Sequence, residues 1–255
     1  MYGLRRNINQ LPAGIQGIAA DLGQPEQLQA ALSTLQHNID VVVYAVAAGG
    51  RTEQQYRDAY VNGMQNLLRT LQARQIRPRL LLFVSSTSVY AQKNDEWIDE
   101  QSATEPASFS GRIMLEAEQV ALNSGLNSSV VRFSGIYGPG RNYLLNQVRN
   151  GIGFAPEPPR YSNRIHRDDC AGVLQHLITL SRSTTLEPIY LASDCEPTLL
   201  HEVTDWLAEQ TDSQITEHSA QRSAGSKRCR NRRLIESGYE FRYPGFRDGY
   251  NAMLK

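Results

Sequence analysis

The feature that most constrains the fold is a regular alternation of short apolar, β-branched runs with segments of helical periodicity. Asp40–Val46, Arg79–Ser85 and Ser129–Phe133 are apolar runs of strand length, bounded by polar residues or glycine. Between them, Thr52–Leu71 and Gly111–Leu122 carry apolar residues near helical spacing. Apolar strands joined by helices are typical of parallel sheets that are covered on both faces. The chain is therefore predicted to form an α/β doubly wound parallel sheet.

The alternation continues in the second half of the chain. Asp168–Leu180 and Thr198–Gln210 are predicted helices, and Ile189–Ala192 is a predicted strand. Asp168 or Asp169 suits the positive N-terminal end of its helix. A loop rich in glycine and proline, Asn150–Asn163, precedes this region and is interpreted as the passage into a smaller C-terminal lobe.

This pattern predicts two domains. Residues 1–150 are expected to form the main domain, and residues 151–255 mainly a lobe, with a segment near 163–195 returning to the sheet. A chain of 255 residues is long enough for one large α/β domain with such a lobe.

Composition and cysteine usage narrow the classes of function. The formal net charge of zero lacks the basic excess of a general nucleic-acid binder. No apolar run reaches the roughly 18 residues of a membrane span, and neither a nucleic-acid nor a membrane partner is expected. The three widely spaced cysteines suggest neither a metal site nor a disulfide framework, which favours a soluble protein of the reducing cytoplasm.

Three motifs carry a family resemblance. Arg132–Arg141 is an apolar run that ends in a Gly/Pro turn, Asn163–Asp169 is a polar cluster, and Ser85–Tyr90 closes an apolar run with hydroxyl residues. Together they resemble the extended or atypical short-chain dehydrogenase/reductase superfamily, in particular its NAD(P)-dependent epimerase/dehydratase-like members. The resemblance implies a Rossmann-type fold, with an NAD(P)-binding domain and a small C-terminal substrate lobe.

A glycine-rich dinucleotide loop, with which that superfamily begins, is not found in this sequence. Tyr2–Arg6 instead resembles the end of the second strand of the family, so the first βα unit, about 30 residues, is expected to be missing. Two explanations stay open at this point. Either the recorded start lies downstream of the real one, which we favour, or the chain has lost its cofactor site.

Arg5 and Arg6 bear on the choice of cofactor. An acidic residue at the end of this strand binds the ribose 2′-hydroxyl of NAD, whereas arginine accommodates a 2′-phosphate. The resemblance therefore favours NADP, with NAD as the second choice, although two arginines near a terminus are also common surface residues. Further cofactor contacts implied by the resemblance are Asp21, Leu22, Ala47, Ala48, Ser85 and Tyr137.

The catalytic positions depart from the family pattern. The resemblance implies that Asn62 organises the site and that Ser86 polarises the substrate, although a hydroxyl at a strand end also commonly caps the next turn. The Tyr-x-x-x-Lys pair of the family is replaced by Ser110 and Met114. Serine is a poor base, and methionine cannot lower the pKa of any neighbour. A substitute acid is conceivable, and Tyr90, Tyr137 and His166 are the candidates.

On the substrate side, the resemblance implies Arg141, Asn163 and His166 as contacts. Asp168 and Asp169 have an equally plausible structural role, in which they cap a helix and bind Arg or His, and a metal site is not expected.

The leading functional hypothesis is an NAD(P)-dependent oxidoreductase or epimerase/dehydratase-like enzyme acting on a small polar substrate, which could be nucleotide-linked. The alternative is a non-catalytic NADP-binding sensor or scaffold protein, which the Ser110/Met114 replacement favours. Dimers through two helices are common in the superfamily, so a homodimer is a further expectation of the resemblance.

Overall fold

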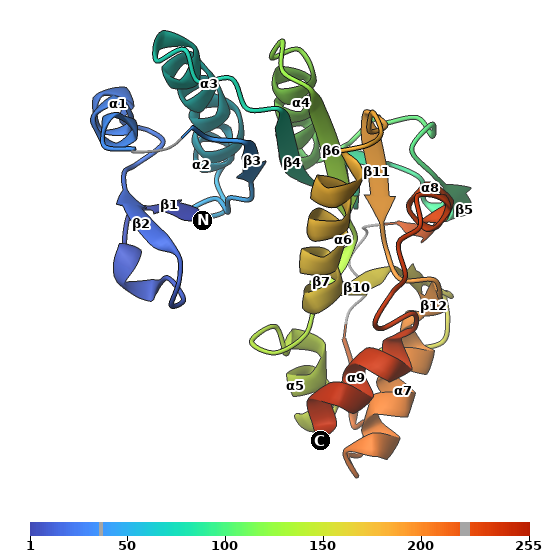
Figure 1. Cartoon of the computed structure of the whole chain (residues 1–255). Coiled ribbons are helices and arrows are strands. Elements are labelled where there is room, and N and C mark those ends of the chain that lie inside the picture. The colour runs from blue at the N-terminus through green and yellow to red at the C-terminus, as the bar shows by residue number, and fades with distance from the viewer. Residues whose placement is uncertain (36–37, 220–224) are drawn as a thin grey trace. The chain divides into compact units, whose positions relative to one another are not determined.

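The computed structural model describes residues 1–35, 38–219 and 225–255 (Figure 1). The chain divides into two compact units. The first comprises Met1–Val84 and Ala107–Val130, and the second comprises Ser85–Pro106 and Val131–Lys255. The division into a cofactor domain and a substrate lobe at residue 150 stays a prediction.

The first unit alternates strands with helices, as its sequence pattern predicts. Its elements are β1 (Tyr2–Arg5), η1 (Ile8–Gln10), β2 (Gln16–Ala19), α1 (Pro25–Ser33), β3 (Val41–Tyr44), α2 (Glu53–Tyr56), η2 (Arg57–Asn62), α3 (Gly63–Ala73), most of β4 (Leu80–Ser86), α4 (Phe109–Leu122) and the start of β6 (Ser128–Phe133). The expected strands at 40–46, 79–85 and 129–133 are confirmed within one to two residues at each end.

The strands of the first unit pair in parallel. β1 pairs with β2 from Tyr2↔Gln16 to Arg5↔Ala19, and β3 pairs with β4 from Val41↔Leu80 to Tyr44↔Phe83. β3 ends the four-stranded order β11-β6-β4-β3, whereas β1 and β2 form a separate two-stranded sheet. The α/β fold with a parallel central sheet is thereby confirmed.

The interior of the first unit explains why β4 begins as a continuous apolar run. Leu80, Leu81, Leu82 and Phe83 are all 0% exposed, so side chains on both faces of β4 are buried. A half-buried strand would instead alternate apolar and polar residues.

The helix predicted at 52–71 contains a local departure from α-geometry. It begins at a Thr52 N-cap with a capping box, and then passes through a π-helical segment, η2, before α3. The backbone N–H of Gly63 bonds to the carbonyl of Asp58, five residues earlier. The Tyr44 hydroxyl donates to the carbonyl of Ala59 within the segment at 2.6 Å.

The second unit combines short strands with helices. Its elements are η3 (Thr87–Val89), β5 (Asn94–Ile98), β7 (Gly135–Tyr137), α5 (Tyr143–Arg149), β8 (Ile152–Gly153), β9 (Tyr161–Ser162), β10 (Arg164–His166), α6 (Arg167–Leu180), β11 (Ile189–Ala192), β12 (Thr198–Leu199), α7 (Leu200–Gln210), β13 (Glu217–His218), β14 (Ser226–Cys229), α8 (Arg232–Glu236) and α9 (Phe246–Leu254). The strand expected at 189–192 and the helix at 168–180 are confirmed.

Three helices of this unit share an apolar core. Leu145 and Val148 of α5 pack with Val203 and Leu207 of α7 and with Phe246 of α9, and all five are at most 2% exposed. The C-terminal helix is therefore an integral part of the second unit (Figure 1).

Two local expectations for the second unit need correction. The stretch 150–163 is not all loop, because it contains β8 and β9. The helix expected from Thr198 begins at Leu200, since Thr198 and Leu199 form β12, which pairs antiparallel with β9. Thr198 pairs with Ser162, which is distant in sequence, and this pairing stabilises the strand conformation here.

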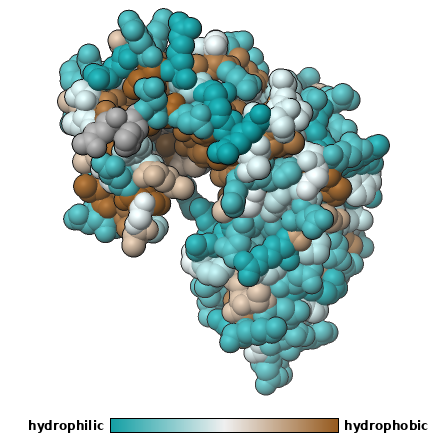
Figure 2. All heavy atoms as spheres, viewed as in Figure 1, coloured by the Kyte–Doolittle hydropathy of each residue, from teal (hydrophilic) through white to brown (hydrophobic). Residues whose placement is uncertain are grey.

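The surface seen in Figure 2 is largely hydrophilic over the second unit, whereas apolar atoms are exposed on parts of the first. Exposed apolar residues of the first unit include Ile8 and Val43, each 38% exposed. In the part of the chain that the structure describes, no helix is long and apolar enough to cross a membrane.

Candidate functional site

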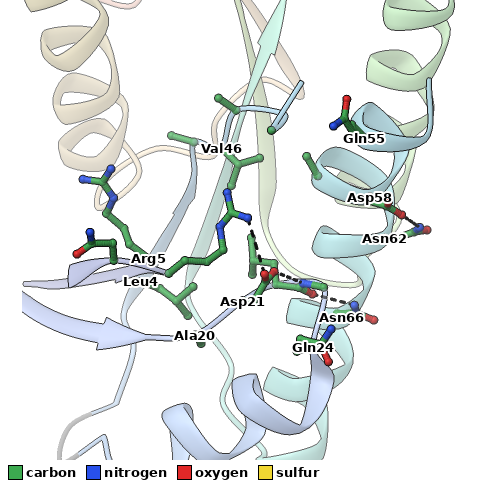
Figure 3. Close-up of a pocket in the computed structure, with 18 of the residues that line it drawn as sticks. Leu4, Arg5, Ala20, Asp21, Gln24, Val46, Gln55, Asp58, Asn62 and Asn66 are labelled. Carbon is green, nitrogen blue, oxygen red and sulfur yellow. Dashed lines mark hydrogen bonds and ion pairs between the residues drawn. The ribbon is translucent and has the colours of Figure 1, made fainter. Parts of the chain in front are cut away.

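A large open pocket lies within the first unit (Figure 3). Its volume is about 1420 Å³, and its walls come from the segments after β1, β2 and β3 and from the helical stretch η2–α3. The carboxyl ends of parallel strands are where open α/β sheets bind ligands. Of the predicted site residues, Arg5, Arg6, Asp21, Leu22, Ala47 and Asn62 line this one pocket.

Small residues form the wall that follows β3. Ala45, Ala47 and Gly49 line the pocket together with Val46. Short side chains leave the backbone of this strand end open to a ligand, which is what close approach of a nucleotide requires. Ala48 does not line the pocket, and its N–H faces the Tyr60 hydroxyl instead. Burial raises the pKa of the Tyr60 phenol, and the Ala48 N–H counteracts part of that rise.

The arginines at the end of β1 both have protein partners. Arg5 donates to Oε1 of Gln10 at 3.3 Å, and Arg6 lies 4.0 Å from the Asp21 carboxylate. The side chains of Arg6 and Asp21 are 74% and 40% exposed, so this ion pair is weak and readily exchanged. Asp21 also accepts the N–H of Gly23 at 2.8 Å, which fixes the turn before α1.

The helical wall carries a hydrogen-bonded carboxylate that the sequence did not single out. Oδ1 of Asp58 accepts from Nε2 of Gln54 and from Nδ2 of Asn62, each at 2.8 Å (Figure 3 draws the second bond). One turn further along, Nδ2 of Asn66 donates to the carbonyl of Leu22 at 2.8 Å. The four-residue spacing from Gln54 through Asp58 and Asn62 to Asn66 was the signal available in the sequence.

The positions that replace the Tyr-x-x-x-Lys pair lie on α4, also in the first unit. The hydroxyl of Ser110 is 3.1 Å from that of Ser108, the N-cap residue of the helix, whose oxygen accepts the Gly111 N–H. Met114 is 6% exposed. These two positions therefore offer a capping contact and an apolar contact, and no group that exchanges a proton near neutral pH.

The remaining predicted residues belong to the second unit, in which Ser86 has a local role. Its hydroxyl accepts the N–H of Ser88 at 3.2 Å and caps η3, as the alternative interpretation expects. Ser85 is 4% exposed. Nearby, the Tyr90 hydroxyl donates to the carbonyl of Asp99 and accepts from Arg132, each at 2.8 Å. Burial raises the pKa of Tyr90 to about 12, so its phenol stays protonated and is a weak substitute acid.

Tyr137 and His166 lie side by side in the second unit. Their rings meet edge to face at 5.3 Å, and they are 5% and 2% exposed. Nδ1 of His166 accepts the N–H of Asp168 at 3.2 Å, so His166, rather than an aspartate, is the N-cap of α6. Asp168 and Asp169 occupy the first turn behind it. Burial raises the pKa of Tyr137 and lowers that of His166, which favours the neutral form of both.

The two remaining substrate-side residues differ in how they are held. Nδ2 of Asn163 donates to the carbonyl of Lys227 at 2.8 Å, and its Oδ1 accepts the N–H of Cys229 at 2.7 Å. Asn163 thus joins the chain before β10 to β14. Arg141 is exposed at the Gly/Pro turn, where its backbone N–H bonds to the carbonyl of Gly138 at 2.8 Å.

Two buried aspartates of this unit have environments that the sequence does not reveal. Asp169 is 0% exposed and accepts three hydrogen bonds from Tyr239, Arg242 and Tyr243. Asp194 is 1% exposed, and its Oδ2 has no hydrogen-bond partner among the described residues. Burial raises the pKa of Asp194 to about 7.

The sequence profile of the RmlD substrate binding domain matches residues 3–152, which is more than half of the chain. The chain belongs to the RmlD substrate-binding domain family. This assignment confirms the resemblance to the extended short-chain dehydrogenase/reductases and their epimerase/dehydratase-like members. No curated protein matches the chain.

Solved structures of related proteins extend this comparison. A protein from Methylobacillus flagellatus assigned as an NAD-dependent epimerase/dehydratase has 35% sequence identity and a TM-score of 0.81, over 99% of this chain and 88% of that one. MoeE5, solved in complex with UDP-glucose and NAD, has 22% identity and a TM-score of 0.81 over the same shares of the two chains. UDP-glucose 4-epimerase from Thermus thermophilus, in complex with NAD, has 17% identity and a TM-score of 0.78 over 99% and 89%. The last two show the fold alone.

Proposed function

We propose that this protein binds NADP(H) in the first-unit pocket and acts as an oxidoreductase or epimerase/dehydratase-like enzyme on a small polar substrate. The observation that carries the proposal is the gathering of Arg5, Arg6, Asp21, Leu22 and Ala47 around one pocket at the carboxyl ends of β1 and β3. The NAD-bound relatives of the same fold support a nicotinamide cofactor. The arginines favour NADP, because guanidinium groups bind phosphate.

The residues of the pocket suit the adenosine half of such a cofactor. Arg5 and Arg6 supply cations for a 2′-phosphate, and the alanine-rich end of β3 admits the ribose without steric conflict. When bound, the nicotinamide supplies the hydride donor or acceptor. For the substrate, we propose that the Ser86 hydroxyl polarises a carbonyl or hydroxyl. We propose separately that Asn62, fixed by Asp58, organises the first-unit pocket.

A nucleotide sugar is the substrate class we propose, because two relatives of the same fold were solved with UDP-glucose or act on it as 4-epimerases. The exposed Arg141 is a suitable contact for its phosphates. The three cysteines, all free, support a cytoplasmic location.

The first test is a fluorescence titration of the chain with NADPH and with NADH. Saturable binding with a preference for NADPH is expected, and Arg5→Gln combined with Arg6→Gln should reduce that preference. Binding of neither nucleotide would contradict the proposed function.

Turnover is tested separately, by NADPH oxidation over a panel of carbonyl compounds that includes nucleotide sugars. Ser86→Ala should abolish turnover, whereas Ser88→Ala, an exposed hydroxyl of the same turn, should not. Turnover that is equal in the Ser86→Ala variant and the parent chain would exclude the proposed role of Ser86.

A second function has one specific observation in its favour. With Ser110 and Met114 at the catalytic positions, α4 lacks the proton-exchanging pair of the superfamily. This supports a non-catalytic NADP-binding sensor or scaffold. Tight NADPH binding together with no turnover on any compound of the panel would favour it over the enzyme.

A further inference from the structure

We propose that Arg69 is a third phosphate-binding cation of the first-unit pocket and helps the protein to distinguish NADP from NAD. The inference rests on the proposed function, because it concerns the same pocket. It adds a residue from α3, outside the strand end from which cofactor preference was predicted.

The first argument is the position of Arg69. It lines the same pocket as Arg5, Arg6 and Asp21, but it comes from α3. This helix is held firmly, since Leu67 and Leu71 are 8% and 3% exposed. A cation on an anchored helix is positioned more sharply than one on a loop, which is what selective binding requires.

The second argument is that Arg69 is uncommitted. Arg5 is bonded to Gln10 and Arg6 is paired with Asp21. Across residues 1–35, 38–219 and 225–255, no hydrogen bond or ion pair holds the side chain of Arg69. An exposed guanidinium without a protein partner is free to take a ligand anion at no cost in broken contacts.

The third argument is the charge that the pocket must supply. A phosphate monoester carries about −1.5 to −2 charges at pH 7. The carboxylate of Asp21 offsets one of the two charges of Arg5 and Arg6, which leaves the strand end with only one net positive charge. Asp58, the other acid of the pocket, is bonded to two neutral amides, which leave its charge in place. The charged residues that line the pocket therefore sum to zero without Arg69 and to one positive charge with it, so Arg69 supplies the net positive charge that a phosphate requires.

The experiment uses 2′,5′-ADP and 5′-AMP as probes, because they differ only in the 2′-phosphate and need neither the pyrophosphate nor the nicotinamide part of the pocket. Dissociation constants are measured by isothermal titration calorimetry on the full chain and on Arg69→Gln. The matched control is Arg74→Gln, which removes an exposed arginine at the C-cap of the same helix that does not line the pocket. Thermal melts verify that all three proteins are folded.

The parent chain is expected to bind 2′,5′-ADP more tightly than 5′-AMP. Arg69→Gln should raise the dissociation constant of 2′,5′-ADP roughly tenfold or more, as expected for the loss of a charge-assisted hydrogen bond. The dissociation constant of 5′-AMP should stay within about twofold of the parent value. Arg74→Gln should leave both constants within about twofold. The effect of Arg69→Gln should shrink at high salt, because the contact is ionic.

Two outcomes would overturn the inference, and they are distinguishable. If the parent chain prefers 2′,5′-ADP and Arg69→Gln keeps that preference in full, the role of Arg69 is refuted while NADP binding stands. If the parent chain binds neither probe, the proposed cofactor fails and the inference fails with it.

Discussion

The carboxylate of Asp169 is expected to be the most sensitive single position for the stability of the second unit. Its Oδ1 accepts the Tyr239 hydroxyl and the Arg242 N–H, each at 2.8 Å, and its Oδ2 accepts the Tyr243 N–H at 3.0 Å. The side chain is 0% exposed. It therefore fastens the chain segment before α9 to the first turn of α6, where the helix dipole also favours a negative charge.

The expected loss in the free energy of unfolding on substitution of Asp169 follows from these contacts. A hydrogen bond to a charged group contributes about 1.5–3 kcal/mol, and removing one partner of a buried charged network costs about 3–5 kcal/mol. Asp169→Ala should thus lower the free energy of unfolding by about 4 kcal/mol. Asp169→Asn should cost about 2 kcal/mol, because its amide NH₂ cannot accept the Tyr243 N–H. Against a typical total of about 5–15 kcal/mol, either loss is large.

The assay is urea denaturation followed by circular dichroism, with Asp168→Asn as the matched control. Asp168 lies in the same turn, but its side chain is 41% exposed and its ion pairs span 3.7–4.0 Å, so its loss should cost less than about 1 kcal/mol. A double-mutant cycle with Tyr239→Phe should give a coupling energy of about 1–2 kcal/mol. Asp169→Asn and Asp169→Ala variants within about 0.5 kcal/mol of the parent chain would refute this reasoning.

Three further predictions concern other buried contacts. Because the pKa of Asp194 is raised from 3.8 to about 7, the folded state holds its proton more tightly than the unfolded chain, so the free energy of unfolding should fall by up to about 4 kcal/mol between pH 4 and 7. Asp194→Asn should flatten that profile in urea titrations at several pH values, and an unchanged slope would exclude Asp194 as its source. Gly249→Ala should lower the stability of the protein by about 1–3 kcal/mol in thermal melts, because the added Cβ would overlap the Tyr137 hydroxyl. Adding Tyr137→Phe to this variant should recover part of the loss. A Gly249→Ala variant as stable as the parent chain would count against this packing. Tyr44→Phe should cost about 1–2 kcal/mol, because it removes the hydrogen bond to the Ala59 carbonyl, and a melt identical to that of the parent chain would show that this bond contributes nothing.

The sheet and the longer helices could be predicted because their signals are local. β4 is buried on both faces and therefore appears as an uninterrupted apolar run, and β11 was predicted to the residue. The two-residue strands β8, β12 and β13 carry no such signal, since their pairing partners are distant in sequence. The π-helical segment was also missed, because its apolar residues are compatible with both α-helical and π-helical spacing.

The sequence could predict those residues of the candidate site that directly follow a predicted strand. Arg5, Arg6 and Ala47 follow strands whose carboxyl ends meet at one pocket, although their roles stay predictions. The engagement of Asn163 with backbone groups of Lys227 and Cys229 could not be foreseen, because those partners lie more than sixty residues away. Arg69 gave no signal either, since only the packing of α3 brings it to the pocket.

The π-helical segment η2 also limits how this region can change in length. A π-turn accommodates one residue more than an α-turn, so it shifts the helical phase of everything that follows by about 100°. Met64, Leu67 and Leu71 of α3 face the interior in the shifted phase, at 0%, 8% and 3% exposure. One π-turn closes about the same angle as one α-turn, so deleting a single residue from η2 would restore an ordinary α-helix and leave this apolar row facing the interior. A one-residue deletion at the start of α3, which holds no extra residue, would instead rotate the row by about 100° toward solvent and should be tolerated far less well.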